Sequence, residues 1–278
     1  INISSYQKLL LLPTEVQFRA VRPVAGTSLS RSTAHEFPIS PADQQRLVEM
    51  VTDVFREELA KSRTLTLTTA SLVLSFATWF VMSVLVVRLP AVGFKFDTMQ
   101  LFWLAAMPGL AGGTLRIVHT FLIPIFGTRL VVGVATLLKL IPCIGLGFAM
   151  LNPENPFWMF MLLALLCGMG GGDFSSYMPS TSLFFPKRLQ GAALGIQAGI
   201  GNFGVSLAQF VTPWIIGFAL FGTIAGGSQV FKKGEVIKDI WLQNAVFWYV
   251  PLLIVLGLMC LVWLKSVPVK ASFREQLD

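Results

Sequence analysis

Four ionisable residues lie inside long apolar segments of the sequence: Arg116, His119, Lys139 and Asp173. Placing an Arg, Lys or Asp at the centre of a bilayer costs roughly 2.5–3.5 kcal/mol, so such residues usually face a cavity or a partner. His119 either carries a proton or is a neutral, hydrogen-bonded core histidine, and we favour the second. Lys139 is best explained as a snorkelling or locally paired side chain.

Arg116 is the best candidate for binding a ligand. At helical spacing it shares one face with Gly109, Gly112 and Gly113, which leave room for a neighbouring backbone or for a ligand beside the guanidinium. The guanidinium fork offers paired donors that match two oxygens of a planar oxyanion at once. The alternatives are a structural ion pair with Asp173 or a snorkelling side chain, and position alone favours the binding role.

Two stripes of small and polar residues follow a later apolar segment. Small residues let helices approach closely in lipid, whereas buried amide side chains need polar partners or water. We therefore expect this helix both to pack tightly and to line something polar. The first stripe consists of Gly191, Gly195, Gly199, Asn202, Ser206 and Gln209, and the second of Gln197, Gly201, Gly204 and Ala208.

Chemistry of other kinds has no support in the sequence. Cys143, Cys167 and Cys260 lie in apolar segments without a CxxC or Cys/His spacing, which predicts neither a disulfide framework nor a metal site. The two histidines, His35 and His119, are far apart. Because we also find no nucleophile–base pair and no phosphate loop, we expect no enzyme activity and no cofactor.

The elements that must position these residues are six membrane-spanning helices within residues 65–265. A spanning helix needs roughly 20 mostly apolar residues, whereas a barrel would show short alternating segments. Turn residues separate the segments. The pattern predicts an all-α membrane protein, with spans at Leu67–Leu89, Leu101–Ile125, Leu130–Met150, Phe157–Phe185, Ala192–Phe221 and Trp241–Leu264.

Composition agrees with a lipid environment. Of the 278 residues, 54% are hydrophobic and 13% are charged, about half the charged share of a soluble domain. The net charge of +7 sits between apolar segments, so we interpret it as a signal for membrane orientation and not for nucleic acid. Lys and Arg are more frequent on the side that holds both ends of the chain, which predicts that both termini are cytoplasmic.

Residues 1–64 form the predicted cytoplasmic N-terminal segment, which is partly flexible. Ser40-Pro41 signals the start of a helix. This helix either lies along the membrane surface or packs on cytoplasmic loops. The chain begins Ile-Asn-Ile without Met, which we interpret as a fragment boundary. The apolar face of the helix consists of Leu47, Val48, Val51, Val54, Phe55 and Leu59.

Longer motifs carry a resemblance to a known family. Residues 168–178 read GMGGGDFSSYM, residues 184–187 read FFPK and residues 191–206 read GAALGIQAGIGNFGVS. These stretches resemble the nitrate signature of the nitrate/nitrite porter family of the major facilitator superfamily, in particular its NarK-like bacterial branch. Residues 115–129 are similar to the family's substrate-arginine helix. The resemblance covers about residues 65–278, and residues 266–278 resemble the start of the family's central cytoplasmic loop.

The resemblance implies roles for particular residues. Arg116 would grip nitrate or nitrite, Phe174 would pack against the bound anion, and Asn202 would form a hydrogen bond near it. Gly199 and Gly201 match signature glycines at which helices slide.

Four positions depart from the family's usual pattern. The family usually has Asn at the positions of Asp173 and Gln197, often an aromatic residue at His119, and commonly an apolar residue at Lys139. An ionised Asp173 would repel nitrate, so we expect it to be protonated, paired with Arg116 or His119, or turned away. His119, Asp173 and Gln197 are therefore candidate proton carriers or polar partners.

The family has twelve spans in two six-helix halves. This chain would be the first half, itself a pair of inverted three-helix repeats, and its partner would be the missing C-terminal half. The resemblance implies nitrate and nitrite transport by alternating access in the bacterial inner membrane, with exchange favoured over proton symport. The alternative is a truncated, non-transporting or sensory membrane protein that retains the fold.

Overall fold

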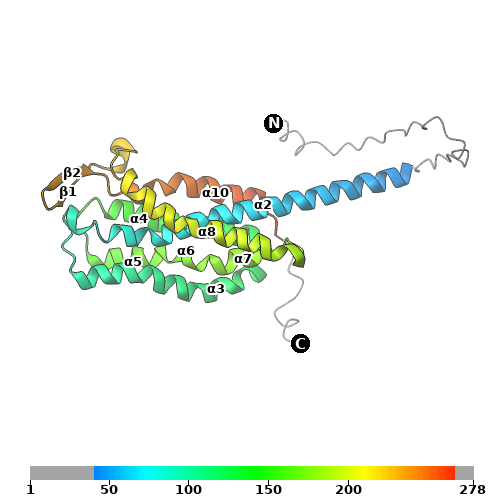
Figure 1. Cartoon of the computed structure of the whole chain (residues 1–278), viewed down its shortest axis with the longest axis horizontal. Helices are drawn as coiled ribbons and strands as arrows, with labels where there is room; N and C mark the ends of the chain where they lie inside the picture. Colours follow the sequence, from blue (N-terminus) through cyan, green and yellow to red (C-terminus); the bar gives the residue numbers. More distant parts are fainter. Residues whose placement is uncertain (1–40, 267–278) are drawn as a thin grey trace, which may run out of the picture. The chain divides into compact units, whose positions relative to one another are not determined.

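The computed structural model describes residues 41–266 (Figure 1). The flexible segment expected before residue 41 and the loop expected after residue 266 lie outside these residues. The chain divides into two compact units, residues 1–59 and 60–278. The candidate functional residues all belong to the second unit.

The first helix of the described residues, α2, runs from Pro41 to Leu85. It begins where the sequence predicted a helix start. The sequence contains neither Gly nor Pro between Pro41 and Leu85, so nothing stops the helix before the first apolar segment. The same helix therefore continues from the residues ahead of the first predicted span into that span. Apolar side chains of its early part, including Val51, Val54 and Phe55, are exposed.

The long helix α3, Thr98–Leu138, consists of two arms separated by Gly127. A capping box between Asp97 and Gln100 starts the first arm. Gly127 has φ 75° and ψ 162°, a non-helical conformation that glycine adopts at low cost. The break coincides with the turn predicted between the second and third apolar segments.

The two arms of α3 run in opposite directions. In the first arm, Gly112 lies against the backbone of Gly168, and the later His119 bonds to the later Ser176. The first arm therefore runs in the same direction as residues 168–176. After Gly127, Thr136 of the second arm meets Tyr177, and the later Gly145, in the helix Leu140–Ala149 that continues this arm, meets Leu163. The contacts therefore run in the opposite direction. The chain therefore folds back on itself at Gly127.

Short helical segments join into longer rods at residues whose dihedral angles stay helical. Lys139 links α3 to α4, Leu140–Ala149. Gly168 and Asp173 link α5, Phe157–Cys167, through α6, Met169–Gly172, to α7, Phe174–Ser182. In the same way α9, Asn244–Phe247, continues through Trp248 into α10, Tyr249–Trp263.

Helix α8, Lys187–Ile215, packs against α7 and α9. After it comes a short 3-10 helix, η2, Gly222–Ala225, and then an antiparallel hairpin of β1, Gln229–Lys233, and β2, Val236–Ile240. An earlier 3-10 helix, η1, spans Pro90–Val92 and contacts β1. The hairpin lies between the fifth and sixth predicted spans, where the all-α prediction expected no strand.

Four helical stretches of the described residues are long and apolar enough to cross a membrane. The second of them combines both arms of α3 with α4. The predicted multi-pass, mostly helical membrane protein is thereby confirmed. Helix α8 is not among the four although its 29 residues would extend about 44 Å, because its polar stripes reduce its hydropathy. The stretches are Gln45–Leu85, Thr98–Ala149, Phe157–Ser182 and Asn244–Trp263.

Candidate functional site

Arg116 extends from the first arm of α3 toward α6 and α7. Its Nε donates a hydrogen bond to the carbonyl oxygen of Gly171 at 3.1 Å. Its Cζ lies 5.3 Å from the ring centroid of Phe174 and 5.8 Å from that of Trp79, close enough for cation–π attraction. The guanidinium is thus partly buried and held against two aromatic rings inside the helix bundle.

The glycine run in α6 allows this arrangement. A Cβ atom on Gly170 would lie 2.1 Å from the carbonyl oxygen of Ser75, and one on Gly171 would lie 2.7 Å from the Trp79 ring. Any side chain at these positions would push α6 away from α2, because no flexible group can yield at the Ser75 backbone. The close approach of the helices places the Gly171 carbonyl within reach of Arg116.

Asp173 forms a buried ion pair with Lys139. The Nζ atom of Lys139 lies 2.5 Å from Oδ2 of Asp173, and the hydroxyl of Ser75 donates to the same oxygen at 2.6 Å. Lys139 Nζ also donates to the carbonyl of Ala135 at 2.7 Å. Asp173 and Lys139 are 0% and 1% exposed. Lys139 therefore does not snorkel, and Asp173 is paired across the bundle.

His119 is buried beside this pair. Its Nδ1 lies 3.0 Å from the hydroxyl of Ser176 and 3.7 Å from Oδ1 of Asp173. The bond to Ser176 agrees with the favoured interpretation of a hydrogen-bonded core histidine.

Among these buried and partly buried charges, Lys139 and Asp173 form an ion pair without net charge, and Arg116 is a separate cation. Lys139 and Asp173 compensate each other, and in the described part of the chain Arg116 forms no ion pair with Asp173 or another acid. The terminal nitrogens of Arg116 likewise have no hydrogen-bond acceptor among residues 41–266. Guanidinium donors with this freedom can bind two oxygens of a planar anion.

The two predicted stripes of α8 differ sharply in burial. Every residue of the stripe that contains Gln197 and Gly201 is buried, and every residue of the stripe that contains Gly199 and Asn202 is exposed. Gln197 donates to the carbonyl of Tyr177 at 3.2 Å, and a Cβ on Gly201 would lie 2.6 Å from Leu72. The stripe that contains Gln197 and Gly201 therefore packs the helix against the bundle.

The exposed stripe does not meet Arg116 within the described residues. The amide of Asn202 donates to the carbonyl of Ala198 at 2.8 Å, one turn earlier in its own helix. A Cβ built on Gly199 has no atom within 4 Å. The structure thus brings Arg116, Phe174, Asp173 and His119 together and leaves Asn202 and Gly199 on an open face of α8.

Comparison with curated proteins finds close relatives over most of the chain. It is 64% identical over 217 residues to the probable nitrate/nitrite antiporter NarK2 of Thermus thermophilus, a match covering 78% of this chain and 49% of the relative. It is 39% identical over 216 residues to the nitrate/nitrite transporter NarU of Escherichia coli, covering 77% and 46%. This chain belongs to the nitrate/nitrite porter family. No protein-family model matches it.

The chain spans about half the length of the curated relatives that it matches. Its relatives carry names of transporters and antiporters, not of enzymes.

Two of the positions that depart from the usual pattern of the nitrate/nitrite porter family contact each other. Asp173 and Lys139, two of the departures that the resemblance implied, form the buried ion pair. Each charge alone would be costly to bury, and together they compensate. The closest charged partner of Asp173 is thus Lys139, and not Arg116 or His119 as the sequence predicted.

The sequence analysis also missed residues of the site that carry no charge. Trp79 lies beside the guanidinium, and its Nε1 donates to the carbonyl of Pro108 at 2.7 Å, which fixes the ring between α2 and α3. Ser75, one turn earlier, bonds to Asp173. Both lie four residues apart on one helical face, and this spacing was the available signal.

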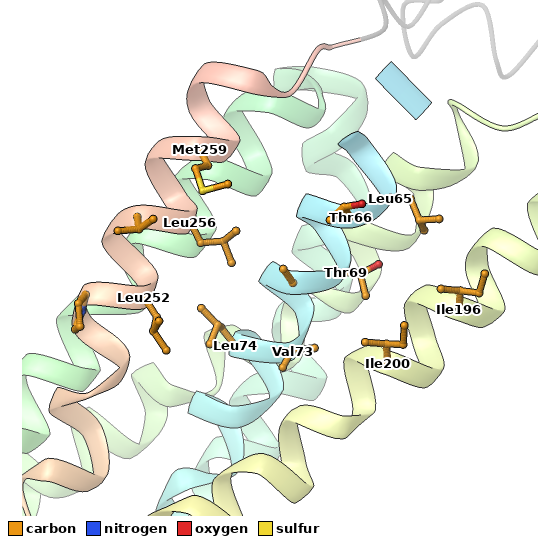
Figure 2. A pocket seen from close by; sticks show the side chains of 13 residues that line it. Leu65, Thr66, Thr69, Val73, Leu74, Ile196, Ile200, Leu252, Leu256 and Met259 are labelled. Carbon is orange, nitrogen blue, oxygen red and sulfur yellow. The ribbon is translucent and has the colours of Figure 1, made fainter. Parts of the chain in front are cut away.

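A large open groove lies elsewhere, between α2, α8 and α10 (Figure 2). It encloses about 790 Å³ and is almost entirely apolar, with Thr66 and Thr69 as its polar side chains. It offers no cation, so it does not suit a small anion. The remaining lining residues are aliphatic side chains, a proline and a methionine, such as Leu65, Val73, Ile196, Ile200, Leu252 and Met259.

Proposed function

We propose that this chain forms the first, six-span half of a nitrate/nitrite transporter that works by alternating access. Its relatives are named as nitrate/nitrite transporters and antiporters, and the proposal extends that activity to the whole protein of which this chain would be a part. The substrates would be nitrate and nitrite, and the location the bacterial inner membrane with both termini in the cytoplasm.

The state of Arg116 is the observation that carries this proposal. The guanidinium is partly buried, is held by Gly171, Trp79 and Phe174, and has no acidic partner in the described residues. A cation in an apolar bundle strongly favours an anion as its neutralising partner, because the local dielectric constant is low. Nitrate is planar and singly charged, so its oxygens match the guanidinium fork.

The helical rods support a division into six spans. The two antiparallel arms of α3 would count as separate spans, with α4 extending the second arm, and α8 would be the fifth span. The exposed stripe of α8 would be costly if it faced acyl chains. We therefore propose that this face, with Asn202 and Gly199, lines the transport pathway or packs against the second half.

Exchange is favoured over proton symport because the buried acid is already neutralised. Asp173 lies 2.5 Å from the Lys139 ammonium, so it needs no proton to remain in the bundle. His119 is engaged by Ser176. Nitrate/nitrite exchange moves one anion for another and requires no titrating group.

The proposal is tested with the full-length transporter in proteoliposomes. Uptake of labelled nitrate is measured with and without internal nitrite, with and without a proton gradient. We expect uptake to need internal nitrite and to ignore the gradient. If a proton gradient drives uptake into vesicles that contain no nitrite, the mechanism is proton symport and not exchange.

Arg116→Lys tests whether the guanidinium of Arg116 binds nitrate. Lysine keeps the charge but not the paired donors, so we expect nitrate uptake to fall by about 100-fold, the scale of losing one or two charge-assisted hydrogen bonds. Arg88→Lys is the matched control, since Arg88 Nη1 bonds to the carbonyl of Val84 in its own helical turn. Unchanged uptake in Arg116→Lys would remove the paired donors of Arg116 from the mechanism. A wild type that moves no nitrate would favour the non-transporting alternative.

A further inference from the structure

We infer that Lys139 is a positioning residue for anion binding: its buried ion pair with Asp173 keeps that carboxylate from pairing with Arg116. The guanidinium then stays available to the transported anion. This inference rests on the proposed function and adds to it a residue that does not touch the anion.

Asp173 is the acid best placed to compete for Arg116. The guanidinium bonds to the carbonyl of Gly171 and lies against Phe174, and these two residues flank Asp173 in the sequence. Asp173 is 0% exposed, so water cannot solvate its charge. A buried carboxylate with no other cation would be strongly drawn to the nearest guanidinium.

Lys139 satisfies this carboxylate from the opposite direction. It arrives from the second arm of α3, whereas Arg116 lies on the first arm, so the two cations approach Asp173 from different rods. Lys139 Nζ and the Ser75 hydroxyl both hold Oδ2, at 2.5 and 2.6 Å. Ala135 provides a second acceptor for Nζ at 2.7 Å, which orients the ammonium without help from Arg116.

Other groups around Asp173 cannot replace the lysine. His119 faces Oδ1 at 3.7 Å, too far for a hydrogen bond, and its Nδ1 is directed to Ser176. Oδ1 itself has no hydrogen-bond partner among the described residues. If Lys139 lost its charge, Oδ1 would be the free oxygen able to accept from Arg116.

The consequence is a competition that affects affinity more than turnover. When a fraction of the protein holds Arg116 paired to Asp173, the apparent affinity for the anion falls by that fraction. Saturating nitrate would displace the carboxylate, so the maximal rate would change less. This distinguishes a positioning role from a merely structural one, which would lower the amount of folded transporter without raising KM.

The test compares full-length wild type, Lys139→Met, Asp173→Asn and the double variant in nitrate/nitrite exchange. Met matches the length of Lys, and Asn matches the shape of Asp. We expect Lys139→Met to raise the KM for nitrate by about tenfold or more while kcat changes less. Asp173→Asn removes the competitor and is expected to keep KM within about threefold of wild type. The double variant should return KM to that range as well, which is the decisive rescue.

Each outcome decides the inference. A Lys139→Met variant with wild-type KM overturns it, as does a double variant whose KM stays as high as that of Lys139→Met. If Lys139→Met does not fold, nitrate-induced thermal stabilisation of Asp173→Asn and of the double variant is compared with wild type, and loss of stabilisation in both overturns it. A wild type that neither binds nor exchanges nitrate overturns the proposed function itself, whatever the variants do.

Discussion

The ammonium of Lys139 and the carboxylate of Asp173 lie 2.5 Å apart at the centre of a helical bundle in which both side chains are buried. They come from different rods, α3 and the junction of α6 and α7. Each is expensive in an apolar environment unless the other is present. The pair therefore fixes how these two rods meet, and Arg116 is left as the separate cation beside them.

Removing the hydroxyl that supports this pair should destabilise the bundle. Ser75→Ala deletes the donor 2.6 Å from Oδ2 of Asp173, and we expect a loss of about 1–3 kcal/mol, the cost of leaving a buried charged acceptor short of one bond. The thermal unfolding midpoint of the detergent-purified protein measures it. Ser83→Ala is the control, because Ser83 is exposed and bonds only within its own helix, to Phe80. Equal midpoints for both variants would contradict this prediction.

The close approach of α6 to α2 predicts a second pair of variants. In Gly170→Ala the new methyl would lie 2.1 Å from the Ser75 carbonyl, so the helices must separate and we expect about 1–3 kcal/mol of destabilisation. Gly191→Ala, in the second turn of α8, meets no atom within 4 Å and should be neutral or stabilise by about 0.5–1 kcal/mol. Both are compared by thermal unfolding. If Gly170→Ala did not change stability, α6 and α2 could not pack as closely as the Gly170–Ser75 contact requires.

The exposed polar stripe of α8 predicts which side of that helix meets water. We expect Ser206→Cys, on the stripe, to react with a water-soluble maleimide in native membranes. Nitrate should slow this reaction. Ile200→Cys, which lines the apolar groove, should stay unreactive because acyl chains would face it. The three cysteines of this chain are buried at 0–2% exposure, so they should contribute little background labelling. Faster labelling at Ile200 than at Ser206 would reverse the proposed orientation.

The burial of α8 was predictable from the sequence because helical spacing alone separates its two stripes. Gln197 and Gly201 fell on one predicted stripe and are buried, whereas Asn202 and Gly199 fell on the other and are exposed. The turn at Gly127 was also predictable from local turn chemistry. These features depend on residues that are near one another in the sequence.

Features that depend on how distant rods meet were not predictable in the same way. Which cation pairs with Asp173 is decided by the reversal of α3 at Gly127, which carries Lys139 back alongside α6 and α7. The hairpin after α8 was missed for another reason. Its strands are short and mostly exposed, so they show little of the periodic burial that marks a strand.

The attachment of this hairpin to the helices provides the last prediction. Gln229 is its main anchor: Nε2 donates to the carbonyl of Met150 at 3.1 Å and to Gln243 at 3.0 Å, and Oε1 accepts from the backbone N–H of Leu242 at 2.9 Å. Gln229→Leu would leave all three partners without their bond. Each such loss costs about 0.5–1.5 kcal/mol, so the hairpin should open more often while the bundle stays folded.

Limited trypsin digestion measures this opening, because Lys232, Lys233 and Lys238 lie exposed on the two strands. When opening is fast relative to cleavage, the cleavage rate follows the population of the open form, so we expect about tenfold or faster cutting within residues 229–240 in Gln229→Leu. Gln45→Leu makes the same chemical change at an exposed position of α2. Trypsin should cleave residues 229–240 of this variant at the wild-type rate. If Gln229→Leu is cleaved no faster than this control, the three hydrogen bonds do not hold the hairpin, and the contact of β1 with η1 must anchor it instead.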